Sequence, residues 1–110
     1  MQKLRGRVVL GRAFIGETGS ALKKVKRYTP TLSPAAVAAN TTAEQTFTVT
    51  GLAATEVPLA VVKPTAQAGL GIVGWRVSAA NTLAITFVNA TAASITPTAA
   101  QVYEVIVLTV

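Results

Sequence analysis

The sequence predicts an all-β protein: an antiparallel β-sandwich, of the jelly-roll or immunoglobulin-like type, with an extended basic N-terminal arm. β-branched and aromatic segments recur about every ten residues after residue 40, with turn signals between them. No segment has a convincing apolar period for a helix of three turns. Residues 1–30 hold eight of the ten cations and one acid, a net charge of +7, whereas the rest is nearly neutral. We therefore predict an attachment arm over residues 1–30 and a domain over residues 31–110.

The predicted arm contains two basic stretches with a turn between them. The side chains of residues 4–15 follow, in part, the two-residue alternation of a strand. This segment fits an edge strand that becomes ordered on contact with a partner. Residues 16–20 (GETGS) form a turn. The second basic stretch, residues 23–28, has one aromatic, and residues 29–34 contain two prolines and fit an extended connector.

Two strands are predicted in the first half of the domain. Residues 46–50 (TFTVT) alternate strictly, which directs Phe47 and Val49 toward the core. Residues 57–63 form the second strand. Pro58 indicates that it lies at the start of this strand or that the strand is at a sheet edge. The alanines of residues 35–40 allow at most one short helical turn.

Three strands are predicted in the second half. Residues 69–78 form a strand whose three glycines favour a bulge, and a turn at 79–82 leads into residues 83–88. In the latter, Leu83, Ile85 and Phe87 alternate with smaller residues and face the core. A loop spans 89–98. Residues 102–110 are apolar on both faces, so this strand is central and covered twice, or contributes to an interface.

The composition argues against an enzyme. The chain has no His, no Cys and no Asp, which removes the commonest catalytic triads, proton shuttles and metal ligands. Its four glutamates lie in separate segments. We predict no catalytic residues, no cofactor and no metal.

The glycines of residues 69–74 (GLGIVG) match the spacing of a dinucleotide-binding loop. A β-prone segment follows instead of a helix, and no acid lies about twenty residues on. We therefore interpret them as part of a strand. Trp75 and Arg76 are a candidate surface contact, although a lone Trp in a small β domain is more often a core anchor. Glu104 is expected to pair with Arg76 or Lys63 across strands.

The cations near the N-terminus are the candidate attachment residues. They are Arg5, Arg7, Arg12, Lys23, Lys24, Lys26 and Arg27. Docking on an acidic protein surface is the favoured interpretation, and a solvated tail that aids solubility is second. Nucleic acid is third, since only Phe14 and Tyr28 lie near the charge for base stacking.

Residues 42–52 (TAEQTFTVTGL) and 69–89 (GLGIVGWRVSAANTLAITFVN) resemble a class of small virion proteins of tailed bacteriophages. Residues 95–97 (ITP) and 103–107 (YEVIV) fill the last two places of that pattern, which covers about residues 40–108. Trp75 stands where the pattern has a small residue. The resemblance implies a β-sandwich of the head decoration, or cement, type.

That resemblance implies a structural protein of the capsid surface, made in the bacterial cytoplasm. Its partner would be the major capsid protein or another virion protein. A core of about eighty residues rich in Ala and Val is marginal for a monomer, which favours self-association or docking on a larger body. The resemblance implies that the homo-oligomer is a trimer or dimer. The alternative is a fibre, neck or tail module that binds a host-surface glycan or receptor. The third hypothesis is nucleic-acid binding through the arm. No apolar run is long enough to span a membrane, and no signal peptide is predicted.

Overall fold

A computed structural model describes residues 24–109 of the chain, and within them every regular element is a β-strand. The strands are β1 (Lys24–Tyr28), β2 (Thr31–Leu32), β3 (Thr41–Thr48), β4 (Val57–Val62), β5 (Leu70–Ala79), β6 (Thr82–Asn89), β7 (Gln101–Val102) and β8 (Glu104–Thr109). All the paired strands are antiparallel. The predicted all-β class with antiparallel pairing is confirmed.

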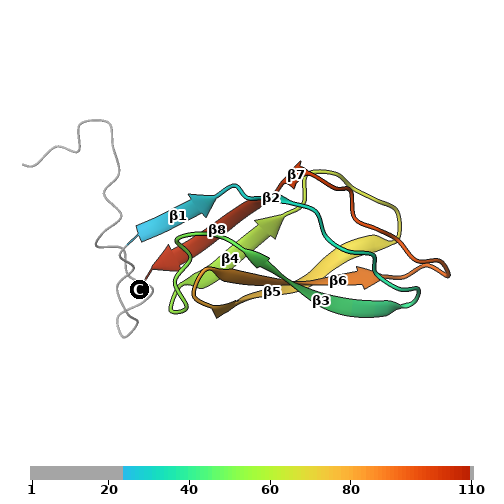
Figure 1. The fold of residues 1–110 in the computed structure, drawn as a ribbon, viewed down its shortest axis with the longest axis horizontal. Helices are drawn as coiled ribbons and strands as arrows, with labels where there is room; N and C mark the ends of the chain where they lie inside the picture. The colour runs from blue at the N-terminus through green and yellow to red at the C-terminus, as the bar shows by residue number, and fades with distance from the viewer. Residues whose placement is uncertain (1–23, 110) are drawn as a thin grey trace, which may run out of the picture.

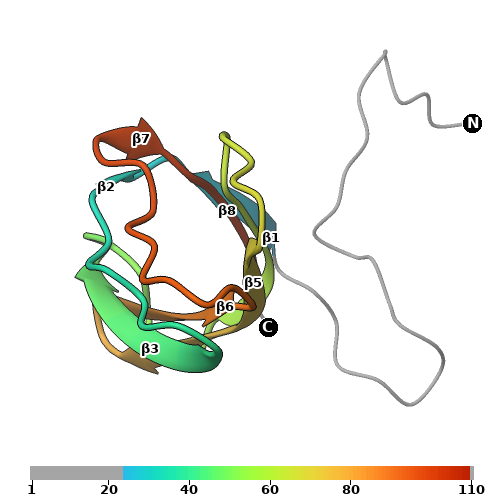
Figure 2. The same cartoon turned by 90° about the vertical axis from the view of Figure 1, so that its right-hand side faces the viewer.

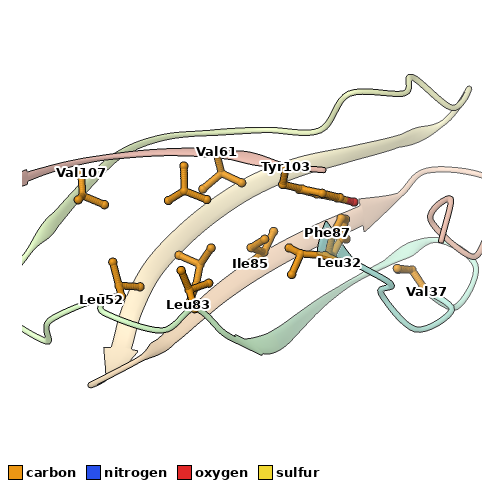
Figure 3. Close-up of a cluster of buried hydrophobic side chains, with 11 residues drawn as sticks. Leu32, Val37, Leu52, Val61, Leu83, Ile85, Phe87, Tyr103 and Val107 are labelled. Carbon is orange, nitrogen blue, oxygen red and sulfur yellow. The ribbon is translucent and has the colours of Figure 1, made fainter. Parts of the chain in front are cut away.

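The strands form two three-stranded sheets, in the orders β1-β8-β4 and β3-β6-β5, and a small β2-β7 sheet (Figure 1). Viewed from the end, the sheets surround a common interior (Figure 2). β6 and β8 are the central strands, so each brings its apolar alternation to that interior. Leu83, Ile85 and Phe87 of β6 face Val107 across it (Figure 3), and all four are fully buried. The arrangement is compatible with a β-sandwich.

The predicted strand at 46–50 is part of the longer strand β3, which begins at Thr41 and ends at Thr48. Pairing with β6 in a continuous register, from Thr41 with Asn89 to Thr48 with Thr82, extends it in the N-terminal direction. Phe47 packs against the core as predicted. Val49 lies just beyond the strand and is buried, and its N–H donates to the Asn81 carbonyl at 2.8 Å.

The glycine-rich segment is strand β5, which confirms its interpretation as a strand rather than a dinucleotide-binding loop. The predicted bulge is present, because the register with β6 shifts between Ile72 and Gly74. Val73 is therefore turned outward and is exposed. The same shift directs Trp75 toward the core, opposite Ile85 of β6.

Pro58 lies near the start of β4, which is an edge strand of its sheet, as predicted. A further register shift falls between Pro58 and Ala60, opposite β8. No helical turn forms around Val37. That residue is buried, and its N–H and carbonyl pair with Ile95 at 2.8 and 3.0 Å.

Tyr103 lies between β7 and β8, and its ring fills the core beside Leu32 and Phe87 (Figure 3). Its hydroxyl is buried and has no hydrogen-bond partner among residues 24–109. Burial also raises the pKa of this phenol. A buried hydroxyl without a partner costs about 1–3 kcal/mol.

We expect Tyr103→Phe to raise the free energy of unfolding by about 1 kcal/mol, because it removes that unpaired hydroxyl and leaves the ring in place. Urea unfolding of both proteins measures the difference. A lower stability of the variant would show that the hydroxyl makes a hydrogen bond in solution.

Candidate attachment surface

The seven candidate attachment residues divide between the described fold and the segment before it. Arg5, Arg7, Arg12 and Lys23 lie outside the described residues. Lys24, Lys26 and Arg27 form strand β1, which pairs with β8 over its whole length. Residues 24–28, assigned from the sequence to the arm, are therefore a strand of the domain. Tyr28 holds this strand in place, since its ring packs against the core and its hydroxyl donates to the Gly51 carbonyl at 3.0 Å.

Alternation along β1 separates the basic cluster into two faces. Lys26 pairs in register with Val107, a core residue of β8, and so faces inward. Arg27 pairs with Ile106 and faces outward. Lys26 and Arg27 are neighbours in the sequence but lie on opposite faces of the sheet.

Lys26 meets a buried carboxylate. Its Nζ lies 2.7 Å from Oε2 of Glu56, a residue that is 5% exposed. The Ala53 N–H and the Thr109 hydroxyl each donate to the same carboxylate at 2.9 Å. Burial alone would raise the pKa of Glu56, but these three donors outweigh it and lower the pKa to about 2. The contact also raises the pKa of Lys26.

Arg27 pairs with Glu104 on the outward face of the same sheet. The predicted pairing of Glu104 with Arg76 or Lys63 is wrong. β1 is the direct neighbour of β8, whereas Arg76 lies on β5 in the other sheet, and Lys63 follows β4 and donates to the Thr65 carbonyl instead.

Arg76 forms a bidentate ion pair with Glu44 of β3. Its Nε and Nη2 donate to the two carboxylate oxygens, each at 2.9 Å, and this contact lowers the pKa of Glu44. Arg76 pairs in register with Ala84 of the intervening strand β6. The ion pair crosses β6, which accounts for the complete burial of Ala84 on this outer face.

Trp75 is partly buried and packs against the core cluster. Its indole N–H donates to the Pro58 carbonyl at 3.2 Å, which links β5 to β4 and therefore one three-stranded sheet to the other. Of the two candidate contact residues, Trp75 thus has a structural role, and Arg76 is exposed but engaged by Glu44.

A cleft of about 300 Å³ lies beside the end of β4 and the start of β5. Val61, Leu70 and Ile72 give it an apolar wall, and Lys63 and Gln67 add polar groups. Burial lowers the pKa of Lys63. Gln67 is already engaged, since its amide nitrogen donates to the Thr96 carbonyl and its oxygen accepts from the Thr98 N–H.

Sequence reasoning identified the two-sided apolar character of β8 but missed the residues that complete its outward face. Val25 of β1 and Val57 of β4 pair with Leu108 from either side. Both valines are nearly half exposed. Apolar and polar residues alternate only weakly along β1 and β4, so neither strand by itself indicates an apolar outward face. The face becomes evident only from the pairing of these strands with β8, which lies far from both in the sequence.

Within residues 24–109, no group of three or more acidic side chains could hold a metal ion, and no helix could cross a membrane. No family model, no curated protein and no solved structure matches this chain. Residues 24–109 form an all-β fold of antiparallel sheets, and β1, at the N-terminal end of the described range, directly follows a segment of basic sequence.

Proposed function

We propose that this chain is a non-catalytic structural protein of a bacteriophage virion, which binds the outside of the capsid and stabilises it. The two three-stranded sheets would then be the layers of a β-sandwich, with the segment before β1 as the attachment arm. The resemblance of residues 42–52 and 69–89 to small virion proteins supports this proposal.

One observation carries the charge argument. Each of the three glutamates in the described fold already pairs with a cation of the same fold: Lys26 with Glu56, Arg27 with Glu104, and Arg76 with Glu44. The chain has only one other acid, Glu17, and a net charge of +6. The excess positive charge therefore favours an acidic partner outside the chain.

Strand addition would supply the remaining contacts. β1 is an edge strand, and no strand in the described range pairs with its outer edge. The free N–H and carbonyl groups of such an edge accept an extended segment of a partner. Many copies bound to the assembled shell, but not to its dissociated subunits, would stabilise the shell by mass action.

The two alternative functions have less support. A glycan-binding module would use Trp75 as an exposed platform, but its ring packs on the core and its N–H is engaged by Pro58. A nucleic-acid-binding arm would use Lys26 and Arg27, and both are paired with glutamates. Negligible DNA affinity at physiological salt would remove that alternative, as would affinity that survives changing Lys23, Lys24, Lys26 and Arg27 to Gln.

Electron microscopy of the source particle, labelled with an antibody against this chain, tests the proposal. We expect label over the whole shell. Label at one vertex or along the tail would replace the proposal with a neck, fibre or receptor-binding role. Intact particles without label would overturn it.

A charge variant tests the attachment residues. We expect the full chain with Arg5, Arg7, Arg12, Lys23 and Lys24 changed to Gln to bind capsids at least tenfold more weakly at about 0.1 M salt, since each lost cation removes an attraction to an acidic surface. Sedimentation of the protein with capsids measures the binding. Lys63→Gln, which removes a cation at the end of β4 on the opposite edge of the sheet from β1, is the control. Equal binding by the charge variant would exclude these residues as the attachment site.

A further inference from the structure

The outer faces of the two three-stranded sheets differ in chemistry. On the β3-β6-β5 sheet, the outward positions of β3 are three threonines and Glu44, which pairs with Arg76. These positions are polar and well solvated, and Val73 of β5 is the one large apolar side chain among the described strands of this sheet that is highly exposed. On the β1-β8-β4 sheet, most of the outward side chains are valine, isoleucine or leucine.

The register defines this second face. Val25, Leu108 and Val57 form one row across the three strands. Ile106 lies in the next outward row, and Val62 pairs with Glu104 in the row after that. The three valines are 45%, 47% and 49% exposed, and they lie on the edge strands β1 and β4, on either side of the outward side chains of the central strand β8. A contiguous exposed apolar surface of this kind marks an interaction site.

We propose that this apolar face, made of Val25, Val57, Val62, Ile106 and Leu108, is the contact between two copies of this chain. The inference is independent of the capsid-binding function and concerns a surface other than the basic arm.

The charges on the face favour a second copy over other partners. Arg27 and Glu104 lie side by side on it and neutralise one another. A two-fold axis that passes near this pair would bring Arg27 of one copy toward Glu104 of the other, so that both signs are matched. Residues 1–23 are a poorer cover, because they carry five cations and one acid. Laid over this face, they would bring unmatched positive charge onto valines.

The shape of the face also fits a copy of itself. An outer sheet face packs well against another sheet, with the two about 10 Å apart. Three strands of about six residues give a face of roughly 15 by 20 Å. Two such faces bury on the order of 600 Å² in total, which is below a standard specific interface and in the range of weak, transient contacts. The association is therefore weak, with a dissociation constant on the order of 10 μM.

Sedimentation velocity of the full chain, from about 1 to 200 μM, tests this inference. We expect the wild type to move from monomer to dimer over that range. Val57→Lys and Val62→Lys should each weaken the association at least tenfold, because each places a charge inside the contact. Val73→Lys and Val102→Lys are the matched controls, since these valines are 59% and 51% exposed on other strands and should leave the association unchanged.

Circular dichroism shows whether each variant retains the wild-type fold, and the two single variants, at opposite ends of β4, serve as separate tests. A wild type that stays monomeric at 200 μM, on the order of twenty times the expected constant, would overturn the inference. So would an oligomer that the Val57 and Val62 variants leave intact, or that the control variants disrupt equally. Capsid labelling gives a separate result: a monomer that labels the shell contradicts only the self-association, and a dimer absent from particles contradicts only the proposed function.

Discussion

Replacing Asn89 with Ala is expected to lower the free energy of unfolding by about 3 kcal/mol. Asn89 ends β6 and is fully buried. Its Nδ2 donates to the Val37 carbonyl at 3.0 Å and to the Ala93 carbonyl at 2.8 Å. Its Oδ1 accepts from the N–H and the hydroxyl of Thr91, at 2.9 and 2.7 Å. One side chain thus fixes the loop after β6 and joins it to the segment before β3.

The size of this effect follows from burial. Each buried hydrogen bond contributes about 1 kcal/mol, and removal of the amide leaves the Thr91 N–H without its partner. Urea unfolding measures the loss. Asn89→Asp tests the two donated bonds specifically, because a carboxylate of the same shape cannot donate to the Val37 and Ala93 carbonyls, and it should be at least as damaging. Asn40→Gly, at an exposed position with φ of 52°, should change stability by less than about 0.5 kcal/mol. A loss below about 1 kcal/mol for Asn89→Ala would contradict the assigned role.

Acidification is expected to remove about 2–3 kcal/mol of stability through Glu56 alone. The folded-state pKa of Glu56 is about 2, below the ordinary value of 4.5 that the carboxyl has in the unfolded chain. A group with a depressed folded-state pKa stabilises the fold above its unfolded pKa. The contribution is therefore complete above about pH 5 and is lost as the pH falls through 4.5 toward 2.

Glu56→Gln isolates this contribution. The variant should be less stable than the wild type at pH 7 by about 1–3 kcal/mol, since Lys26 loses its ion pair while the Gln oxygen still accepts from the Ala53 N–H. The difference between the two proteins should shrink as the pH falls from 5 to 2, because protonation of Glu56 removes the same charge from the wild type. Unfolding by urea at several pH values measures both curves. A difference that stays constant with pH would show that Glu56 has an ordinary pKa in the fold.

The sequence alone determined most of the strands and their inward faces. Alternation of apolar and polar residues over 83–88 requires a strand with one buried face, and Leu83, Ile85 and Phe87 are buried on it. Glycine content indicated the bulge in β5, and Pro58 indicated an edge. These features depend on neighbours within a few residues, which is the range over which a single sequence carries a clear signal.

Only the tertiary structure decided which strands are neighbours, and with them the ion pairs and the surfaces. Glu104 pairs with Arg27, 77 positions away, because β1 lies beside β8. The basic cluster looked like one unit in the sequence, yet its residues lie on both sides of β1, where Lys26 reaches buried Glu56 and Arg27 reaches Glu104. The apolar outer face likewise appears only when Val25, Val57 and Leu108 are brought into one row. Strand order and register arise from the burial of one common core by the whole chain, and no local segment encodes that balance of contacts.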